Sequence, residues 1–134
     1  MRSKNLHTLT RDIEKAIRGL VYVSETDSGF SVVCVENEKD RTIESVVKEL
    51  AKHAKGKVKV EPAESFFERL TTEKSWHSEE KRKQTEKFRK LKSLLDTHLS
   101  DVMCCKIGRV KIEIFILGIY EDYLVGVRTE AVET

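Results

Sequence analysis

Hydrophobic positions recur along this chain at two spacings, which predict helices in some segments and strands in others. Near the N-terminus, apolar residues return every three or four positions, as on one face of a helix. They are Leu9, Ile13, Ala16, Ile17 and Leu20. We expect Thr8 or Thr10 to cap this first helix and Gly19 to end it, because hydroxyl side chains favour helix starts and glycine favours helix ends.

Two β-rich runs follow, LVYV at residues 20–23 and FSVVCVE at residues 30–36. The segment between them, SETDSG, is rich in turn-forming residues. The simplest prediction is a hairpin in which the two runs pair and residues 24–29 form the turn. Glu25 would then lie in that turn.

The next segment predicts a second helix and a strand. Thr42 is placed to cap a helix whose apolar face continues almost to Gly56, where the helix should stop. KVKVE at residues 57–61 alternates like a half-buried strand. Pro62 should end this strand, because proline has no N–H group to donate to a neighbour.

A short helix, a loop and a long helix are predicted next. Residues 64–70 have the pattern of a short helix, and residues 71–77 show no periodicity and suit a loop. Ser78 is placed to cap a long helix whose apolar arc begins at Phe88 and ends at Leu99.

Three strands joined by tight turns are expected at residues 102–107, 109–119 and 123–132. One face of the middle strand is apolar throughout, while the other begins with Lys111 and Glu113 and then becomes apolar. Apolar residues on both faces indicate that this end of the strand is covered on both sides. We therefore predict an α+β fold, a three-layer α-β-α sandwich around a mainly antiparallel sheet.

The composition fits a folded protein and gives no reason to expect a strongly anionic partner. The chain has 134 residues, 39% of them hydrophobic, and 25 basic residues nearly balance 23 acidic ones. We expect a single domain over residues 1–134. No apolar run approaches the roughly 20 residues of a membrane span, and the N-terminal stretch lacks the apolar core of a secretory signal.

The three cysteines, Cys34, Cys104 and Cys105, indicate a reducing compartment. Neighbouring strand residues point to opposite faces, so the adjacent pair reads as two separate thiols. Cys34 lies among valines and is expected to be a small core residue, as are the other two, although one of the adjacent pair is free to face outward. With no signal or span, these observations favour a cytoplasmic protein.

Motifs for catalysis or metal binding are absent from the sequence. The four histidines are scattered, with no pair at a ligand spacing. Neither GxSxG nor GxxxxGK[ST] occurs. We expect no catalytic residues, no cofactor and no metal of the protein's own, and a hydrolase is the least favoured class.

Residues 81–92, KRKQTEKFRKLK, hold seven positive residues and one negative residue. Such a stripe suits nucleic-acid phosphates, so a nucleic-acid-binding module is an alternative interpretation. We favour a solvated helix face, because the stripe offers no aromatic side chain on which bases could stack. Phe88 points with the leucines instead.

Three further loci have ordinary interpretations when each is taken alone. Trp76, in the polar segment TTEKSWHSEE, is either folded onto the core or held out as an interface anchor, and both remain open. Glu25 in the predicted turn and the final TEAVET are most simply solubilising surface charge. Nothing in the spacing of the residues places these loci together.

These loci lie in stretches that resemble the nuclease A inhibitor family, small proteins that block sugar-nonspecific DNA/RNA nucleases. GLVYVSETDSGFSV at residues 19–32 is similar to the first hairpin of the family, and SFFERLTTEKSW at residues 65–76 resembles its tryptophan block. EKFRKL, GRVKIEIFILG and the final VET complete a series of short matches in the same order.

The resemblance implies the α-β-α fold and an inhibitory surface made by Glu25, Trp76 and Thr134. The implied partner is a sugar-nonspecific, metal-dependent nuclease in a 1:1 complex. Thr134 would contact the Mg²⁺ of the nuclease directly or through water. Glu25 would pair with a basic side chain of the cleft, and Trp76 would anchor the interface. The complete set of expected partner-binding residues is Glu25, Lys74, Ser75, Trp76, Glu133 and Thr134.

The segment before the tryptophan departs from the family pattern. Where the family has a polar amide and an aspartate, this chain has Lys74 and Ser75. A lysine that faces a cationic cleft is repulsive. Two interpretations stay open: the target nuclease has a differently charged rim, or the protein is a general protein-interaction domain that has lost nuclease targeting.

Overall fold

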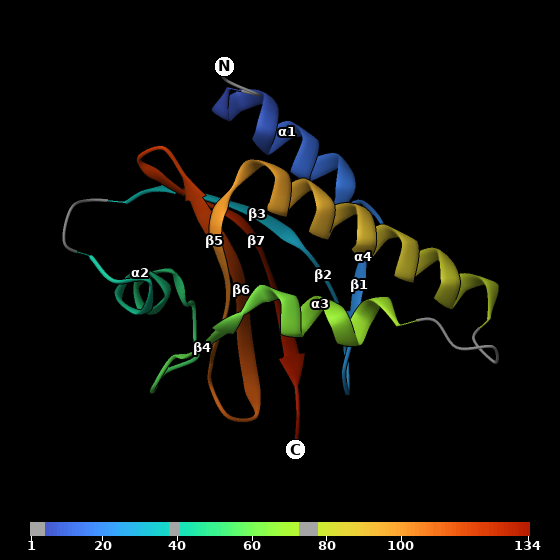
Figure 1. The fold of residues 1–134 in the computed structure, drawn as a ribbon. Coiled ribbons are helices and arrows are strands. Elements are labelled where there is room, and N and C mark those ends of the chain that lie inside the picture. The colour runs from blue at the N-terminus through green and yellow to red at the C-terminus, as the bar shows by residue number, and fades with distance from the viewer. Residues whose placement is uncertain (1–4, 38–40, 73–77) are drawn as a thin grey trace.

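Four helices and seven strands form the part of the chain that a computed structural model describes, which is residues 5–37, 41–72 and 78–134 (Figure 1). The helices are α1 (Leu6–Ala16), α2 (Ile43–Leu50), α3 (Ala63–Thr71) and α4 (Glu79–His98). The strands are β1 (Val21–Val23), β2 (Asp27–Gly29), β3 (Ser31–Glu36), β4 (Lys59–Pro62), β5 (Ser100–Ile107), β6 (Lys111–Tyr120) and β7 (Tyr123–Val132).

Five of the strands make one antiparallel sheet in the order β3-β7-β6-β5-β4. The long strands β6 and β7 lie in its interior and pair along their whole length, from Tyr120 opposite Tyr123 to Lys111 opposite Val132. The short strands β3 and β4 form the two edges. The predicted α+β fold with a mainly antiparallel sheet is therefore confirmed.

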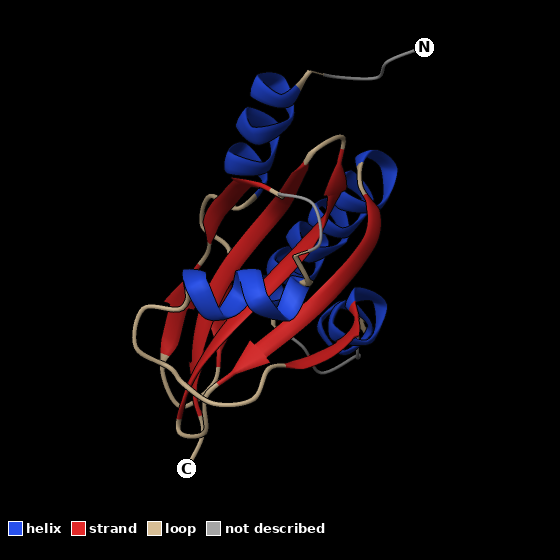
Figure 2. Cartoon of the chain, turned by 90° about the vertical axis from the view of Figure 1, so that its left-hand side faces the viewer, coloured by secondary structure: helices blue, strands red, loops and turns tan. Residues whose placement is uncertain are grey.

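Helices pack on both faces of this sheet. One face and helices α1, α3 and α4 share a core that includes Leu9, Phe66 and Leu91. The other face carries α2, whose Val47 packs in a second core with Phe115 of β6. Figure 2 shows α2 crossing one face of the sheet while the other helices lie behind it. The two apolar faces of the middle strand are the sequence signal for this arrangement.

Of the predictions made for the three cysteines, one is confirmed and two are wrong. Cys104 and Cys105 are both fully buried, one in each core, so their side chains do point to opposite faces of β5. The open possibility that one of them faces outward is therefore wrong, because helices pack on both faces here. The expectation that Cys34 is a core residue is also wrong: it is an exposed free thiol on the edge strand β3.

Side-chain caps begin three of the four helices. The predicted caps of α2 and α4 are confirmed, because Thr42 Oγ1 accepts from the Ser45 N–H at 3.1 Å and Ser78 Oγ accepts from Lys81 at 3.2 Å. The first helix begins earlier than expected. Asn5, rather than Thr8 or Thr10, caps it by accepting from the Thr8 N–H at 2.8 Å.

The predicted first hairpin has different partners in the structure. The run at residues 20–23 pairs with β2, and β2 lies within the segment that was expected to be the turn. The turn itself is therefore shorter and consists of Ser24, Glu25 and Thr26. The second run becomes β3, which leaves the hairpin and pairs with β7. Glu25 still lies at the tip, as predicted.

Candidate functional site

The last residues of the chain lie between two hairpins at one end of the molecule. On one side, Val132 donates its N–H to Ser24 Oγ at 3.0 Å and accepts from the Glu25 N–H at 3.1 Å. On the other side, Glu133 donates its N–H to the Val110 carbonyl at 2.9 Å. The chain end is therefore fixed by backbone hydrogen bonds on both sides, in contrast to the fraying common at termini. Figure 1 shows the C-terminus at the same end as the β1–β2 hairpin.

Glu25 and Thr134 are joined directly. The Thr134 N–H donates to Glu25 Oε2 at 2.6 Å, and the Thr134 hydroxyl lies 3.0 Å and 2.9 Å from the two oxygens of the same carboxylate. Both residues are exposed. The predicted turn and the chain end, which nothing in the sequence placed together, are therefore in direct contact. We call Glu25, Glu133 and Thr134 the acidic tip.

The hydrogen bonds at the acidic tip favour a charged carboxylate. The Thr134 N–H, and next the Thr134 hydroxyl, hold the pKa of Glu25 below its ordinary value. Glu133 is exposed beside it, and its negative charge adds to the effect of burial in raising the pKa of Tyr22. At neutral pH the acidic tip therefore presents the ionised carboxylate of Glu25, with the side chain of Glu133 exposed beside it.

Exposed apolar side chains lie next to the acidic tip. Val23, which directly precedes the β1–β2 turn, is 64% exposed, and Val110, whose carbonyl holds Glu133, is 50% exposed. Apolar surface beside a charged contact excludes water when a partner docks, which strengthens the contact. The remaining predicted contact residues, Lys74, Ser75 and Trp76, lie outside the described residues.

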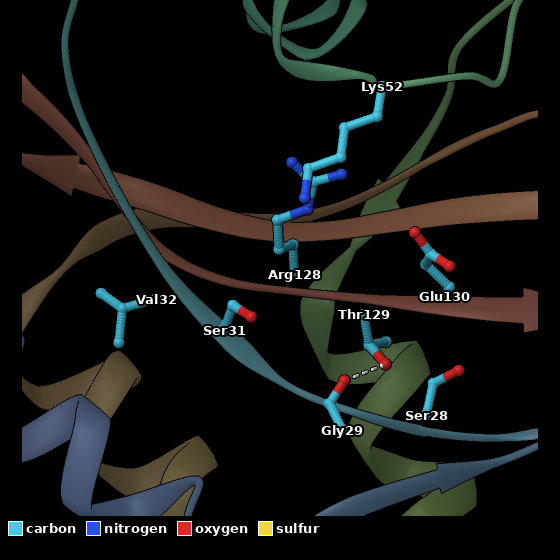
Figure 3. A pocket seen from close by; sticks show the side chains of 8 residues that line it. All are labelled: Ser28, Gly29, Ser31, Val32, Lys52, Arg128, Thr129 and Glu130. Carbon is cyan, nitrogen blue, oxygen red and sulfur yellow. Dashed lines mark hydrogen bonds between the residues drawn. The ribbon is translucent and has the colours of Figure 1, made fainter.

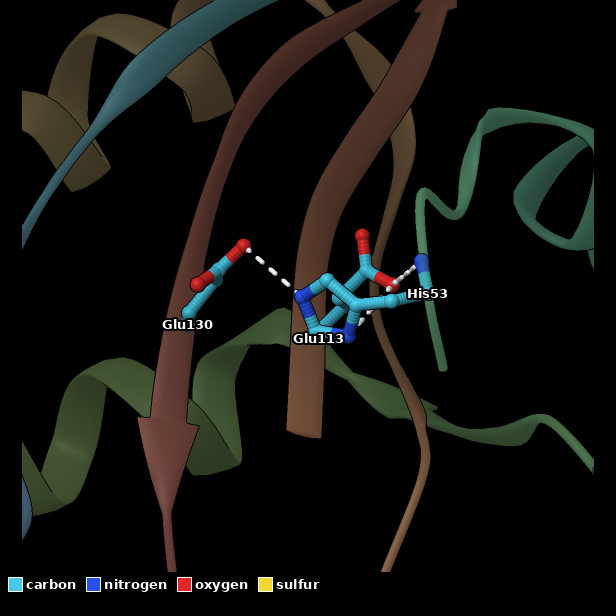
Figure 4. A group of neighbouring side chains, drawn as sticks. All are labelled: His53, Glu113 and Glu130. Carbon is cyan, nitrogen blue, oxygen red and sulfur yellow. Dashed lines mark hydrogen bonds and ion pairs between the residues drawn. The ribbon is translucent and has the colours of Figure 1, made fainter. Parts of the chain in front are cut away.

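A second polar cluster, which sequence reasoning missed, lies on the α2 face of the sheet (Figure 4). Glu113 is fully buried in β6, yet its carboxylate accepts the backbone N–H groups of Lys52, His53 and Ala54 at 2.8–3.1 Å. It also pairs with the Arg128 guanidinium of β7. Burial raises the pKa of Glu113, but the three backbone N–H groups outweigh it and the net shift is downward.

This cluster explains why α2 is shorter than predicted. The helix ends at Leu50 instead of continuing to Gly56, because the N–H groups of the next turn bond the Glu113 carboxylate rather than helix carbonyls. The sequence did contain a signal for this cluster. Two largely apolar strands each carry a charged residue among their apolar positions: Glu113 lies among isoleucines, and Arg128 lies between Val127 and Thr129.

His53 lies between two carboxylates of this cluster. Its Nδ1 is 3.7 Å from Glu113 Oε2, and its Nε2 is 3.4 Å from Glu130 Oε2. The three side chains have metal-binding donor types within 4.8 Å of one another. A metal fits poorly, because both oxygens of Glu113 already accept hydrogen bonds from an arginine and from backbone N–H groups. We interpret the cluster as a structural ion network that joins α2 to the sheet.

The basic stripe on α4 makes contacts within the protein. Lys87 Nζ donates to the Arg18 carbonyl at 3.0 Å, Arg89 donates to the Thr71 carbonyl at 2.9 Å, and Lys92 pairs with Asp96 at 2.7 Å. Two of its cations therefore bind neighbouring segments of the chain, and a third pairs within the helix. The solvated helix face that we favoured over a nucleic-acid surface stays a prediction.

The fold and the acidic tip define a small α+β protein that presents a fixed, acidic chain end from an antiparallel sheet. A family model described as nuclease A inhibitor-like protein matches residues 7–134. The chain therefore belongs to the nuclease A inhibitor-like family, as its sequence resemblance indicated. No curated protein matches the sequence significantly. Among the described helices, none is long and apolar enough to cross a membrane.

Proposed function

We propose that this protein inhibits a sugar-nonspecific DNA/RNA endonuclease by inserting Thr134 and the neighbouring acidic residues into the metal-containing active-site cleft. One observation carries the proposal: in a member of an inhibitor-like family, the Thr134 amide and hydroxyl hold the exposed Glu25 carboxylate at the chain end. The protein acts as a stoichiometric binding partner and not as an enzyme. One inhibitor binds one nuclease.

The chemistry of the acidic tip suits such a cleft. Mg²⁺ prefers hard oxygen ligands and keeps several of its waters. Because the Thr134 hydroxyl proton is directed at Glu25, the lone pairs of that oxygen remain available to a cation or to its water shell. The ionised Glu25 pairs with a basic side chain of the cleft, which favours fast association and a fixed orientation.

Trp76 supplies the apolar anchor in this proposal, with Lys74 and Ser75 at the edge of the contact. Buried tryptophans are common among residues that dominate binding energy. Val23 and Val110 extend the apolar part of the interface beside the acidic tip. Together these residues are proposed to form an interface of standard enzyme–inhibitor size, on the order of 1,600 Å².

The proposal is tested by titrating the protein against a metal-dependent, sugar-nonspecific nuclease at low salt. We expect cleavage of both DNA and RNA to stop near one equivalent of inhibitor. Unchanged cleavage at excess protein, across nucleases of this class, contradicts the proposed activity. Duplex DNA and single-stranded RNA added to the protein alone give no salt-sensitive complex if the activity is inhibition. Such a complex would support the basic-helix alternative instead.

The role of the chain end is tested separately. Deletion of Thr134, or a C-terminal extension, should abolish inhibition and leave the thermal midpoint nearly unchanged, because this end is exposed. An N-terminal tag is the matched control, since α1, the first described element, lies at the opposite end of the molecule from the C-terminus in Figure 1. Equal inhibition by the extended and the N-terminally tagged proteins would remove Thr134 from the mechanism.

A further inference from the structure

A polar hollow of about 470 Å³ opens between the turn after α2, the strands β2 and β3, and the outer part of β7 (Figure 3). Small-molecule sites typically have volumes of about 300–1,000 Å³. Two cationic side chains, Lys52 and Arg128, line this hollow together with the hydroxyl side chains of Ser28 and Ser31. None of these residues belongs to the acidic tip.

Arg128 is held in a fixed orientation at the hollow. Its guanidinium donates to the Leu50 carbonyl at 3.2 Å, pairs with the buried Glu113, and lies 4.6 Å from the centre of the Phe115 ring. Its side chain is only 16% exposed. A guanidinium has five N–H donors, so these two bonds leave donors that can serve a ligand. A donor that is already oriented costs little further entropy on binding.

Lys52 brings a second positive charge to the same hollow. Its backbone N–H is fixed on Glu113, and Figure 3 shows its side chain extending toward Arg128. Within residues 5–37, 41–72 and 78–134, the Lys52 ammonium has no hydrogen-bond or ion-pair partner. Because Glu113 already matches the charge of Arg128, an anionic ligand would chiefly offset the positive charge of Lys52.

The hollow also has an acidic side. Glu130 lines it, and the Glu130 carboxylate is engaged by His53 at 3.4 Å. An anionic group is therefore favoured near Lys52 and Arg128 and disfavoured next to Glu130. The carboxylate of Glu130 is instead suited to accept hydrogen bonds from hydroxyl or N–H groups of the same ligand.

We propose that this hollow binds a small phosphorylated molecule with a hydroxyl-rich body, such as a sugar phosphate or a nucleoside monophosphate. The phosphate lies between Lys52 and Arg128, with the hydroxyls of Ser28 and Ser31 as further donors. The body of the ligand extends toward Glu130. Charge-assisted bonds from a guanidinium and an ammonium are the usual means of holding phosphate oxygens.

The experiment is an NMR titration of the full-length protein at constant ionic strength. Ribose 5-phosphate, adenosine monophosphate, inorganic phosphate and unphosphorylated ribose are added in turn to the wild type and to two variants. Lys52→Met removes the charge and keeps the backbone N–H bond to Glu113. Lys55→Met is the matched control, because Lys55 is an exposed lysine of the same segment and does not line the hollow.

We expect saturable amide shifts at Gly29, Ser31 and Thr129 with the phosphorylated sugars, weaker binding of inorganic phosphate, and no shifts with ribose. Lys52→Met should weaken the affinity by about tenfold or more, as expected for loss of a charge-assisted hydrogen bond, while Lys55→Met should bind like the wild type. Equal affinities of both variants, shifts spread over exposed lysines, or no saturable shifts would overturn the proposal. Inhibition of a nuclease does not enter these measurements, so the two proposals can fail separately.

Discussion

Thr134 donates both its backbone N–H and its hydroxyl to the carboxylate of Glu25, a residue 109 positions earlier in the chain. This pairing connects the tip of the first hairpin to the end of the last strand. It also gives the Glu25 carboxylate a fixed place and a stabilised charge, although both residues face solvent.

The first prediction concerns the pKa of Glu25. Its folded-state pKa lies below the ordinary value of 4.5, so the pairing contributes stability above the unfolded pKa and loses it as pH falls through the folded one. Thr134→Val removes the hydroxyl alone and should raise the pKa partway. Deletion of Thr134 removes both donors and should raise it further. NMR titration of the side-chain carboxyl carbon measures each value, and three equal values would contradict the pairing.

The second prediction concerns the charge of Glu25. Glu25→Gln should weaken inhibition of a matching nuclease by about 2 kcal/mol or more, the cost of removing one partner of a desolvated charge pair. The loss of stability should be small, because solvent screens the charge of an exposed side chain. The control is Asp27→Asn, which removes a carboxylate from the same hairpin without touching Thr134. Inhibition constants that rise equally for both variants would indicate a general charge effect instead.

The third prediction concerns the buried pair of Glu113 and Arg128. Arg128→Met leaves a buried carboxylate without its cation and should lower the free energy of unfolding by about 3–5 kcal/mol. Glu113→Gln added to Arg128→Met should cost less than the sum of the two single changes, because the residues are in direct contact.

Urea unfolding measures these free energies. Glu130→Gln is the control, because Glu130 is half exposed and its pairing with His53 is worth at most about 1 kcal/mol. A loss for Arg128→Met no larger than that of the control would show that the pair does not hold α2 to the sheet.

The fourth prediction compares alanine substitutions at two glycines, one closely packed and one in open space. A Cβ added at Gly126 would lie 1.8 Å from the Ile116 carbonyl oxygen, whereas a Cβ at Gly29 meets nothing within 4 Å. Because the obstacle at Gly126 is backbone, Gly126→Ala should cost about 3 kcal/mol or prevent folding. Gly29→Ala should fold normally, and thermal unfolding compares the two variants. Similar midpoints would show that β6 and β7 are less closely packed than described.

The fifth prediction concerns the different reactivities of the three thiols. Burial raises the pKa of both Cys104 and Cys105 to about 12, so neither forms appreciable thiolate at neutral pH. Cys34 is exposed. One of the three thiols should therefore react with a disulfide reagent in the native protein, and Cys34→Ser should abolish that reaction. Fast reaction of more than one thiol would contradict the burial of the adjacent pair.

Local patterns were sufficient to predict the elements that carry strong periodicity. The long helix α4 begins at the expected cap, and the strands β5, β6 and β7 lie close to their expected positions. The two apolar faces of β6 also predicted helices on both sides of the sheet. These features depend on spacing and capping, which neighbouring residues determine.

Features that depend on distant partners were not predictable. The alternation along residues 20–36 indicates strands, but it does not indicate which strands pair. The predicted pairing of β3 with β1 is therefore wrong, because β3 pairs with β7. The Glu113 network needs the register that places Arg128 opposite Phe115, and the turn that brings the Lys52 N–H within reach. At the acidic tip, Glu25 and Thr134 were each identified from the family resemblance, but their contact follows from the folded sheet.

The position of β7 in the sheet has a consequence for when this protein can act. The strand that positions Thr134 is not an edge of the sheet, because it pairs with both β3 and β6. A chain in which β7 has not paired therefore lacks the assembled acidic tip as well as an interior strand. The proposed inhibition therefore depends on the folded sheet, and it should be lost whenever β7 is not paired with its neighbours.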